Sequence, residues 1–175
     1  MSELLGILSD THGRVATARA AVDLLLERGA TRLVHLGDVG DDSVLDLLAG
    51  VPATVCFGNC DDERPLARYA DAIGIEVGHP SAILEVRGMR VGLTHGHLED
   101  ALADLLDQRP DYILHGHTHE PRDDAVDGVR VLNPGALHRA ARFTAMLLEP
   151  RGGRATWLDV STGETVAVTP SNRAP

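Results

Sequence analysis

Five short polar clusters in this chain contain residue types that bind metal ions, and each cluster follows a short apolar run. The clusters are Asp10-Thr11-His12, Gly37-Asp38, Gly58-Asn59-Cys60-Asp61, Thr94-His95-Gly96-His97 and Gly116-His117-Thr118-His119. The runs before them are residues 4–8, 33–36, 53–57, 91–93 and 112–114. Runs of this kind are typical of buried strands. Because open α/β sheets carry their chemistry at the carboxyl ends of the strands, the sequence predicts one site along that rim.

The residue types in these clusters favour transition metals. Asp10 and His12 are two residues apart on an extended segment, so their side chains point the same way and can reach one ion. The Asp38 carboxylate has two oxygens and could bridge two ions. The other candidate ligands are the amide of Asn59 and the imidazoles of His95, His117 and His119. Such ligands suit Mn²⁺, Fe, Co²⁺ or Zn²⁺ better than Ca²⁺ or Mg²⁺, and a mononuclear site stays open as an alternative.

The helices and strands that must position these clusters are distributed unevenly along the chain: the first third alternates strands and helices, and the last part is mostly strands. The first third alternates strands with predicted helices at 14–28 and 41–49, which is the pattern of a parallel sheet with helical crossovers. Two further helices are predicted at 65–71 and 98–108. Further strands are predicted at 73–77, 82–87, 89–93, 143–148, 155–159 and 165–169, with a hairpin turn at Asp127-Gly128. These elements predict an α/β fold.

Composition and length argue against several classes of protein. The chain has 175 residues, which favours a single domain, predicted at residues 1–169 with a polar tail at 170–175. Its formal net charge of -10 argues against a general nucleic-acid binder, because phosphate backbones attract Lys and Arg. No run approaches the roughly 18 apolar residues that cross a bilayer, and no signal peptide is recognisable. Cys56 and Cys60 form no disulfide framework. We therefore expect a cytoplasmic protein without a membrane partner.

The motif order D-x-H, GD, GN-x-D, H and G-H-x-H resembles that of the calcineurin-like metallophosphoesterases. The GNCD form at residues 58–61 and the small size resemble the YfcE-like phosphodiesterase subfamily, over residues 4–135. This resemblance implies a four-layer α-β-β-α sandwich of two mixed sheets, with a two-metal site at the carboxyl rim. It implies a first metal held by Asp10, His12, Asp38 and His119, and a second held by Asp38, Asn59, His95 and His117.

The resemblance also implies an activity. Two divalent transition-metal ions, with Mn²⁺ favoured and Fe, Co, Ni or Zn as alternatives, would support in-line attack on phosphorus by a metal-bridging hydroxide. Asp38 and Asn59 would lie at the reaction centre. The expected partner is a small phosphate ester, with diesters favoured over monoesters, and the subfamily suggests a homodimer. The alternatives are a phosphomonoesterase, or a scaffold protein that keeps a metal site and is otherwise like the retromer subunit that resembles this subfamily. The metal-ligand pattern of that subunit is eroded, whereas every expected ligand is present here, which favours an enzyme.

Two positions depart from the wider family pattern. Cys60 stands where many members have a histidine that is proposed to protonate the leaving group, and a thiol is a poor substitute for that acid. His97 is the candidate general acid here, and its alternative is a polar residue at the mouth of the site. Ala136, in the Asn-Pro-Gly-Ala segment 133–136, lacks a hydroxyl that could contact phosphate.

The remaining polar residues near the clusters have plainer interpretations. His35 and His115 lie within or beside predicted strands and are expected to be buried and hydrogen-bonded. Asp61 could orient a ligand or cap a turn. The other two histidines, His79 and His138, and the arginine Arg14 are expected at the surface.

Overall fold

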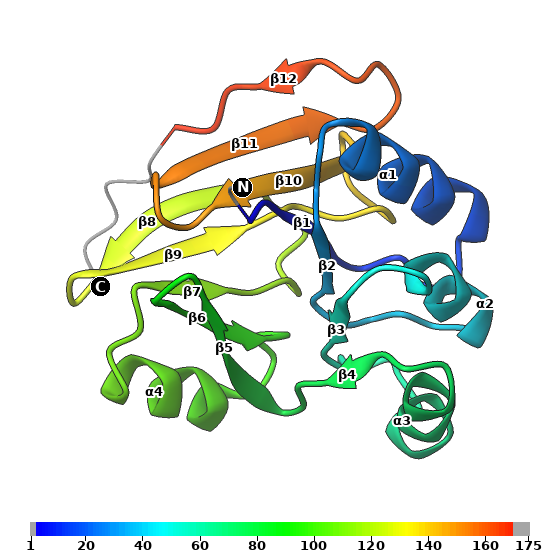
Figure 1. Cartoon of the computed structure of the whole chain (residues 1–175), viewed down its shortest axis with the longest axis horizontal. Helices are drawn as coiled ribbons and strands as arrows, with labels where there is room; N and C mark the ends of the chain where they lie inside the picture. The colour runs from blue at the N-terminus through cyan, green and yellow to red at the C-terminus, as the bar shows by residue number, and fades with distance from the viewer. Residues whose placement is uncertain (1–2, 170–175) are drawn as a thin grey trace.

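The computed structural model describes residues 3–169, and the predicted tail at 170–175 lies outside the described residues. Two mixed sheets form the centre of the molecule (Figure 1). The first sheet has the strand order β12 (Thr165–Val166), β11 (Arg154–Asp159), β10 (Thr144–Glu149), β1 (Leu5–Leu8), β2 (Arg32–His35), β3 (Ala53–Val55) and β4 (Glu76–Val77). The second has the order β5 (Ser81–Val86), β6 (Met89–Thr94), β7 (Tyr112–Leu114), β9 (Val129–Asn133) and β8 (Arg122–Val126).

The predicted parallel start of the chain is confirmed. Strands β1, β2, β3 and β4 pair in parallel, whereas β10 pairs antiparallel with β1. The crossover helices are α1 (Val15–Glu27), α2 (Asp42–Leu45) with the 3-10 turn η1 (Asp46–Leu48), and α3 (Glu63–Ala72). The side chain of Asp41 accepts from the Ser43 N–H and caps α2, as its position in the sequence predicts.

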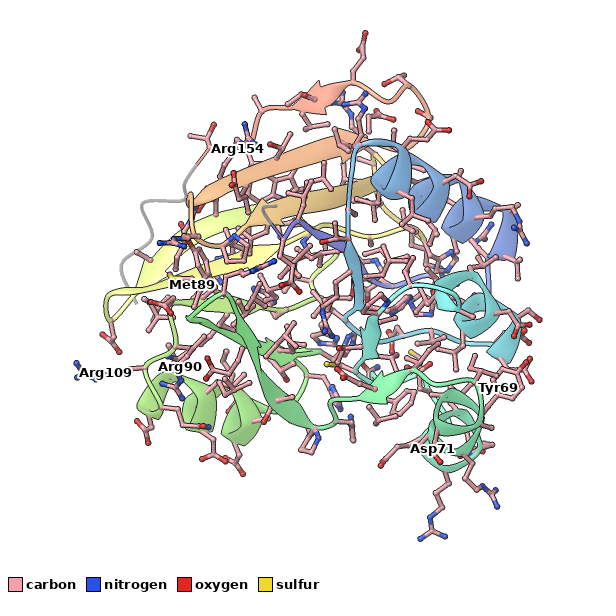
Figure 2. The ribbon with its side chains drawn as sticks, viewed as in Figure 1. Tyr69, Asp71, Met89, Arg90, Arg109 and Arg154 are labelled. Atoms are coloured by element: carbon pink, nitrogen blue, oxygen red, sulfur yellow. The ribbon has the colours of Figure 1, made fainter. Side chains whose placement is uncertain are left out.

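The strand predicted at 73–77 is mostly wrong. Only Glu76–Val77 forms a strand, because the α3 helix continues to Ala72 and the N–H of Ile73 still bonds to the Tyr69 carbonyl. The Tyr69 hydroxyl in turn donates to the Asp46 carboxylate at 2.7 Å and ties α3 to η1 (Figure 2). Helix contacts therefore override the apolar pattern of this segment.

Three buried clusters of side chains separate four layers. The first cluster contains Leu25 of α1, Leu45 of α2 and Leu33 of β2, and it lies between α1–α3 and the first sheet. The second contains Val34 and Val91 and fills the space between the two sheets. The third joins the second sheet to α4 (Glu99–Asp107). Figure 1 shows α4 on the opposite side of the molecule from α1, α2 and α3, so the order of layers is α-β-β-α.

The later part of the chain is β-rich, as predicted. Asp127 and Gly128 have φ values of 50° and 82°, and they join β8 to β9 with Val126 opposite Val129, as a type I′ hairpin requires. Within residues 3–169, no helix is long and apolar enough to cross a membrane.

The carboxyl ends of β1, β2 and β3 lie side by side because these strands are parallel neighbours. The same holds for β6 and β7 in the second sheet. Each of these five strands is followed by one of the polar clusters. The fold therefore brings all five clusters to one rim.

Candidate metal centre

The loops that follow β1 and β2 run side by side and hold the first ligand candidates. The N–H of Asp10 donates to the Gly37 carbonyl at 3.0 Å, and the N–H of His12 donates to the Asp38 carbonyl at 2.8 Å. These backbone bonds join the two loops just past the ends of the paired strands. They fix the carboxylates of Asp10 and Asp38 relative to each other.

Five of the predicted ligands have left-handed backbone conformations, which non-glycine residues rarely adopt. Their φ values are 56° at Asp10, 45° at His12, 52° at Asp38, 66° at His117 and 60° at His119. Such conformations cost about 1–3 kcal/mol each and persist only where the surrounding structure imposes them. Their concentration at one rim is therefore the pattern expected of a functional site.

The buried residues beneath these loops form a hydrogen-bonded network. His35 is fully buried in β2, and its Nδ1 accepts from the Gly37 N–H at 3.2 Å. Because Nδ1 is the acceptor, the proton of the neutral ring lies on Nε2, which is 2.9 Å from the Thr11 hydroxyl. That hydroxyl donates onward to the Val39 carbonyl at 3.0 Å. Burial lowers the pKa of His35 to about 3, so the ring stays neutral.

His95 presents one ring nitrogen to the centre of the site. Its Nδ1 lies 2.7 Å from the Leu36 carbonyl and must donate to it, which leaves the lone pair on Nε2. That nitrogen is 3.6 Å from the Asp38 carboxylate. A Cβ on Gly58 would lie 2.7 Å from the same nitrogen and would also meet Asp38. The absence of a side chain at Gly58 therefore allows the two ligand candidates to approach.

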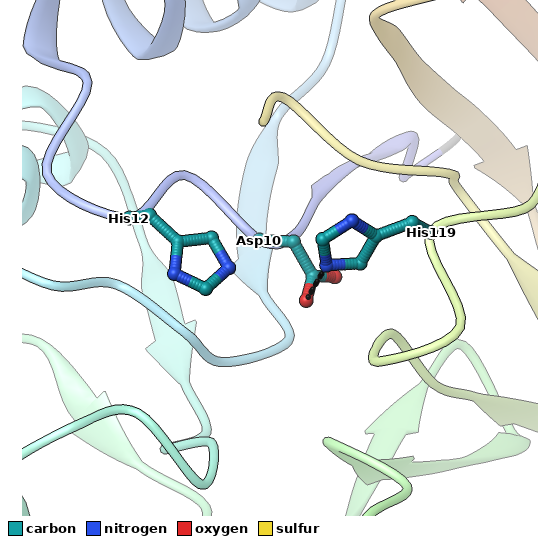
Figure 3. Close-up of side chains that lie close together, drawn as sticks. All are labelled: Asp10, His12 and His119. Carbon is teal, nitrogen blue, oxygen red and sulfur yellow. Dashed lines mark ion pairs between the residues drawn. The ribbon is translucent and has the colours of Figure 1, made fainter. Parts of the chain in front are cut away.

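Three groups of side chains place their ligand atoms within 4.8 Å of one another. The groups are Asp10, His12 and His119; His12, Asp38 and Cys60; and Asp10, Asp38 and His95. In the first group, His119 Nε2 is 3.1 Å from the Asp10 carboxylate (Figure 3). In the second, His12 Nε2 is 3.4 Å from the Asp38 carboxylate.

Several of these atoms are buried without a hydrogen bond from the described residues. They are Asp10 Oδ1, His12 Nε2 and His95 Nε2. Buried polar atoms normally have a partner, and unpaired ones cost stability. Imidazole and carboxylate atoms that converge in this way are suitable ligands for divalent transition metals, so the residues present fit such ions.

His117 contacts residues of the same cluster, and Asn59 contacts its neighbour Cys60, which belongs to one of the ligand groups. The N–H of His117 donates to the Asp10 carboxylate at 3.2 Å, and its ring centroid is 5.2 Å from that of His95. Asn59 is exposed and donates to the Cys60 sulfur at 3.4 Å. The structure thus brings both residues to the loops of the site.

Asp38 and Cys60 differ in their charge at neutral pH. Burial alone would raise the pKa of Asp38, but the hydrogen bond from the Cys60 N–H at 2.9 Å and the nearby imidazoles lower it below its usual value. Asp38 is therefore an anion. Partial desolvation and the Asp38 charge raise the pKa of the exposed Cys60 thiol, which stays protonated. Sequence reasoning missed that this thiol belongs to a group of ligand atoms, since the spacing of Cys56 and Cys60 matches no cysteine motif that binds metal.

His97 is at the mouth of the cluster. Its ring centroid is 5.2 Å from that of His95 and 6.3 Å from that of His117. Desolvation and these two neighbouring rings lower its pKa, so the ring is neutral at neutral pH. The structure therefore places His97 beside the predicted ligands.

Asp61 organises the loops around the site. Its carboxylate accepts from the N–H groups of Val39 at 3.1 Å, Gly40 at 2.8 Å and Gly58 at 2.8 Å. The residue both closes its own turn and joins the loops after β2 and β3. The two interpretations of Asp61 left open by the sequence are therefore compatible.

The expectation of a plain surface position is wrong for His79, whose side chain is only 15% exposed. Its Nδ1 is 3.2 Å from the Phe57 carbonyl. Arg14 is exposed, as expected, but it also makes a contact that was not expected: its Nε donates to His138 Nδ1 at 2.6 Å. The His138 ring lies 4.8 Å from the His12 ring. No sequence signal links Arg14 with a residue so far along the chain.

His35 and His115 are buried, as the sequence predicts, and Ala136 is buried as well. Because Ala136 is fully buried behind the rim, its side chain contributes to packing and is not part of the surface of the site.

The chain is similar to known phosphoesterases over most of its length. A model of the calcineurin-like phosphoesterase superfamily domain matches residues 4–153, which extends past the predicted limit at 135. A phosphodiesterase of Methanocaldococcus jannaschii is 31% identical over 138 residues, covering 75% of this chain and 82% of that protein. The phosphodiesterase YfcE of Escherichia coli is 30% identical over 148 residues, covering 74% of this chain and 76% of that protein.

Solved structures share the whole fold. An archaeal phosphodiesterase has a TM-score of 0.79 at 25% identity, with 89% of this chain and 99% of that chain covered. YfcE has a TM-score of 0.72 at 22% identity, with coverage of 94% and 97%. A single mutant of Vps29 from Entamoeba histolytica has a TM-score of 0.63 at 20% identity, with coverage of 93% and 96%. At these lower identities the last two structures support the fold alone.

Proposed function

The chain belongs to the calcineurin-like phosphoesterase superfamily, and on that premise we propose that it is a metal-dependent hydrolase of small phosphodiesters. The observation that carries this proposal is the convergence of unpaired ligand atoms around Asp38, at the rim where parallel strands end. The relatives named phosphodiesterase support the preference for diesters over monoesters. The Vps29 likeness supports the fold only, so it does not favour a scaffold.

We assign seven ligands to two ions that share Asp38. The first ion would be held by Asp10, His12, Asp38 and His119, and the second by Asp38, Asn59, His95 and His117. Ions bound at these residues would hold the phosphoryl oxygens and lower the pKa of a water between them. The close approaches of His12 and His95 to opposite oxygens of Asp38 support the bridging role of this carboxylate.

The residues of the chain prepare the site before substrate arrives. Asp38 stays ionised because its pKa is lowered, and the Leu36 carbonyl fixes the tautomer of His95. The network of His35 and Thr11 holds the two ligand loops together. This preorganisation means that little rearrangement is needed when the phosphate binds.

His97 is proposed to interact with the leaving group. Its position at the mouth supports a hydrogen bond to the departing oxygen, and its lowered pKa limits the protonated fraction at neutral pH. His97→Ala should therefore slow hydrolysis of an alkyl ester more than that of an aryl ester, because an aryl oxide needs less protonation. Equal losses on both esters would refute this role and favour a residue that only lines the mouth.

The proposed activity is tested with bis(p-nitrophenyl) phosphate and p-nitrophenyl phosphate. The protein is stripped with a chelator, reloaded with Mn²⁺, Ni²⁺ or Zn²⁺, and assayed beside Asn59→Ala and Asp38→Ala. We expect turnover of the diester to return with metal, to fall in Asn59→Ala, and to disappear in Asp38→Ala together with bound metal. A folded protein that turns over neither ester with any metal would contradict the proposal and favour a scaffold role.

The number of ions is tested separately by metal analysis of the reloaded protein. Two ions per chain in the wild type, with loss of both in Asp38→Ala, would support the bridge. A single ion that survives in Asp38→Ala would support the mononuclear alternative.

A further inference from the structure

A hollow of about 410 Å³ adjoins the proposed metal site on the side of His119. One wall is the loop 118–121 and the other is the segment 139–142, with Thr144 and Val166 between them. We call this hollow the Arg139 pocket. Its volume lies within the roughly 300–1,000 Å³ range of small-molecule sites. His119 belongs both to this pocket and to the ligand group with Asp10, so the two are continuous.

Buried hydrogen bonds fix the shape of the pocket. The side chain of Asn133 is fully buried and donates to the Thr118 hydroxyl at 3.1 Å, while its oxygen accepts from the Gly135 N–H at 2.8 Å. The Thr144 hydroxyl donates to the Pro134 carbonyl at 2.7 Å. The turn at 133–135 therefore connects Thr118 of the first wall to Thr144. These buried bonds hold that part of the pocket lining in place.

The charged residues of the pocket are unusual for this acidic chain, whose net charge is -10. Two arginines, Arg139 and Arg142, line the pocket with one carboxylate, Glu120. Arg142 is oriented by Asp159 at 3.3 Å yet stays 58% exposed. Arg139 is exposed and has no hydrogen bond or ion pair among residues 3–169. Its guanidinium is thus free to bind an anion.

Arg14 adds positive charge between the pocket and His12. His138 precedes Arg139 in the chain, so Arg139 begins directly beside this histidine. Arg14 donates to His138, and the His138 ring packs 4.8 Å from the ring of His12. The rim between the proposed metal ligands and the pocket therefore carries arginines from two distant segments.

We propose that the Arg139 pocket binds an anionic group, a carboxylate or a second phosphate, on one of the two substituents of the diester. This inference rests on the proposed function, which places the scissile phosphate at the ligand cluster. A substituent that extends past His119 enters the pocket, where the planar guanidinium of Arg139 can donate two parallel hydrogen bonds to an oxyanion. The negative charge of Glu120 repels the bound anion. It therefore weakens the preference of the pocket for an anionic substituent over a neutral one.

The experiment uses two diesters that both release p-nitrophenol, 4-carboxyphenyl 4-nitrophenyl phosphate and its neutral 4-carbamoylphenyl analogue. A binding measurement by calorimetry uses 4-carboxyphenylphosphonate and 4-carbamoylphenylphosphonate, which have no ester bond to cleave. The variants are Arg139→Gln, Glu120→Gln and, as a matched control in the β10–β11 turn, the exposed Arg151→Gln. All measurements use the metal-loaded full chain.

In the wild type we expect the carboxylate to lower KM and Kd about 5- to 10-fold relative to the carbamoyl group, as expected for partly exposed charge-assisted bonds. Arg139→Gln should remove this difference and leave the neutral analogue unchanged. Glu120→Gln should enlarge the difference, and Arg151→Gln should preserve it. Because Arg139→Gln and Glu120→Gln act in opposite directions, a general loss of folding cannot imitate the result.

The inference would be overturned if KM and Kd were equal for the carboxylate and carbamoyl compounds in the wild type, or if the preference for the carboxylate survived in Arg139→Gln. Either result would leave the proposed function intact. Turnover of neither diester, with a phosphonate preference that still depends on Arg139, would support the pocket and refute the proposed function. Loss of both turnover and the phosphonate preference would overturn both.

Discussion

Replacing His35 by leucine should destabilise the metal-free protein and change how its stability depends on pH. The ring is fully buried, so the leucine leaves the Gly37 N–H without its partner. An unsatisfied buried donor costs about 1–3 kcal/mol. The lost contact with the Thr11 hydroxyl adds about 0.5–1.5 kcal/mol, and less if that hydroxyl keeps its bond to the Val39 carbonyl. At about pH 7.5 the total is between about 1.5 and 4.5 kcal/mol.

The pH dependence follows from the lowered pKa of His35, which burial shifts from 6.5 to about 3. Between these two values the unfolded chain binds a proton that the folded chain does not. The stability contributed by the neutral ring is therefore fully present above pH 6.5 and is lost as the pH falls toward 3. At about pH 5 this loss is about 2 kcal/mol, since each pH unit is worth about 1.4 kcal/mol.

The leucine variant lacks this titration, so its disadvantage should shrink by about 2 kcal/mol between pH 7.5 and pH 5. Urea unfolding of metal-free protein, followed by fluorescence of the buried Trp157, measures the difference at each pH. Thr11→Val is the matched control, because it removes the hydroxyl contact and keeps the titrating ring. A gap that is constant across this pH range would refute the argument that His35 is held neutral, and a gap below about 0.5 kcal/mol at pH 7.5 would refute the hydrogen bonds.

Three further changes test the positioning of the ligands. Gly58→Ala should weaken metal binding at least about tenfold, because its Cβ would meet His95 Nε2 at 2.7 Å. Competition with a chelator measures this. The control Gly152→Ala, whose Cβ would have three Glu149 side-chain atoms as its nearest neighbours, should bind metal as the wild type does. Asp61→Ala should cost about 2–4 kcal/mol and reduce turnover, since three backbone N–H groups lose their acceptor; unchanged thermal stability would contradict this. Asp41→Ala, which removes only the α2 cap, should cost about 1 kcal/mol in urea unfolding with normal turnover.

Much of the fold could be predicted because the apolar pattern of the strands is local. The strand ends, the crossover helices and the Asp127-Gly128 hairpin all appear at or near their predicted positions. The strand prediction for residues 73–77 failed because α3 continues to Ala72 and Ile75 is buried without being in a strand. Pattern alone does not distinguish a short buried strand from a buried segment that follows a helix.

The sequence by itself also determined which residues could be ligands and that they would meet at one rim. Asp10 and Asp38 follow the neighbouring parallel strands β1 and β2, whose carboxyl ends lie side by side, and His95 follows β6 of the second sheet. The three side chains form one ligand group. The ligand assignment remains a prediction, and the contacts of the structure support it.

Only the tertiary structure decided how those ligands are held and what surrounds them. The tautomer of His95 depends on the Leu36 carbonyl, which follows a strand of the other sheet. The neutral state of His35 depends on complete burial. The contact of Arg14 with His138 joins residues 124 positions apart. Side-chain types and strand order are encoded locally, whereas desolvation, proton position and the joining of distant charges exist only once the chain has packed.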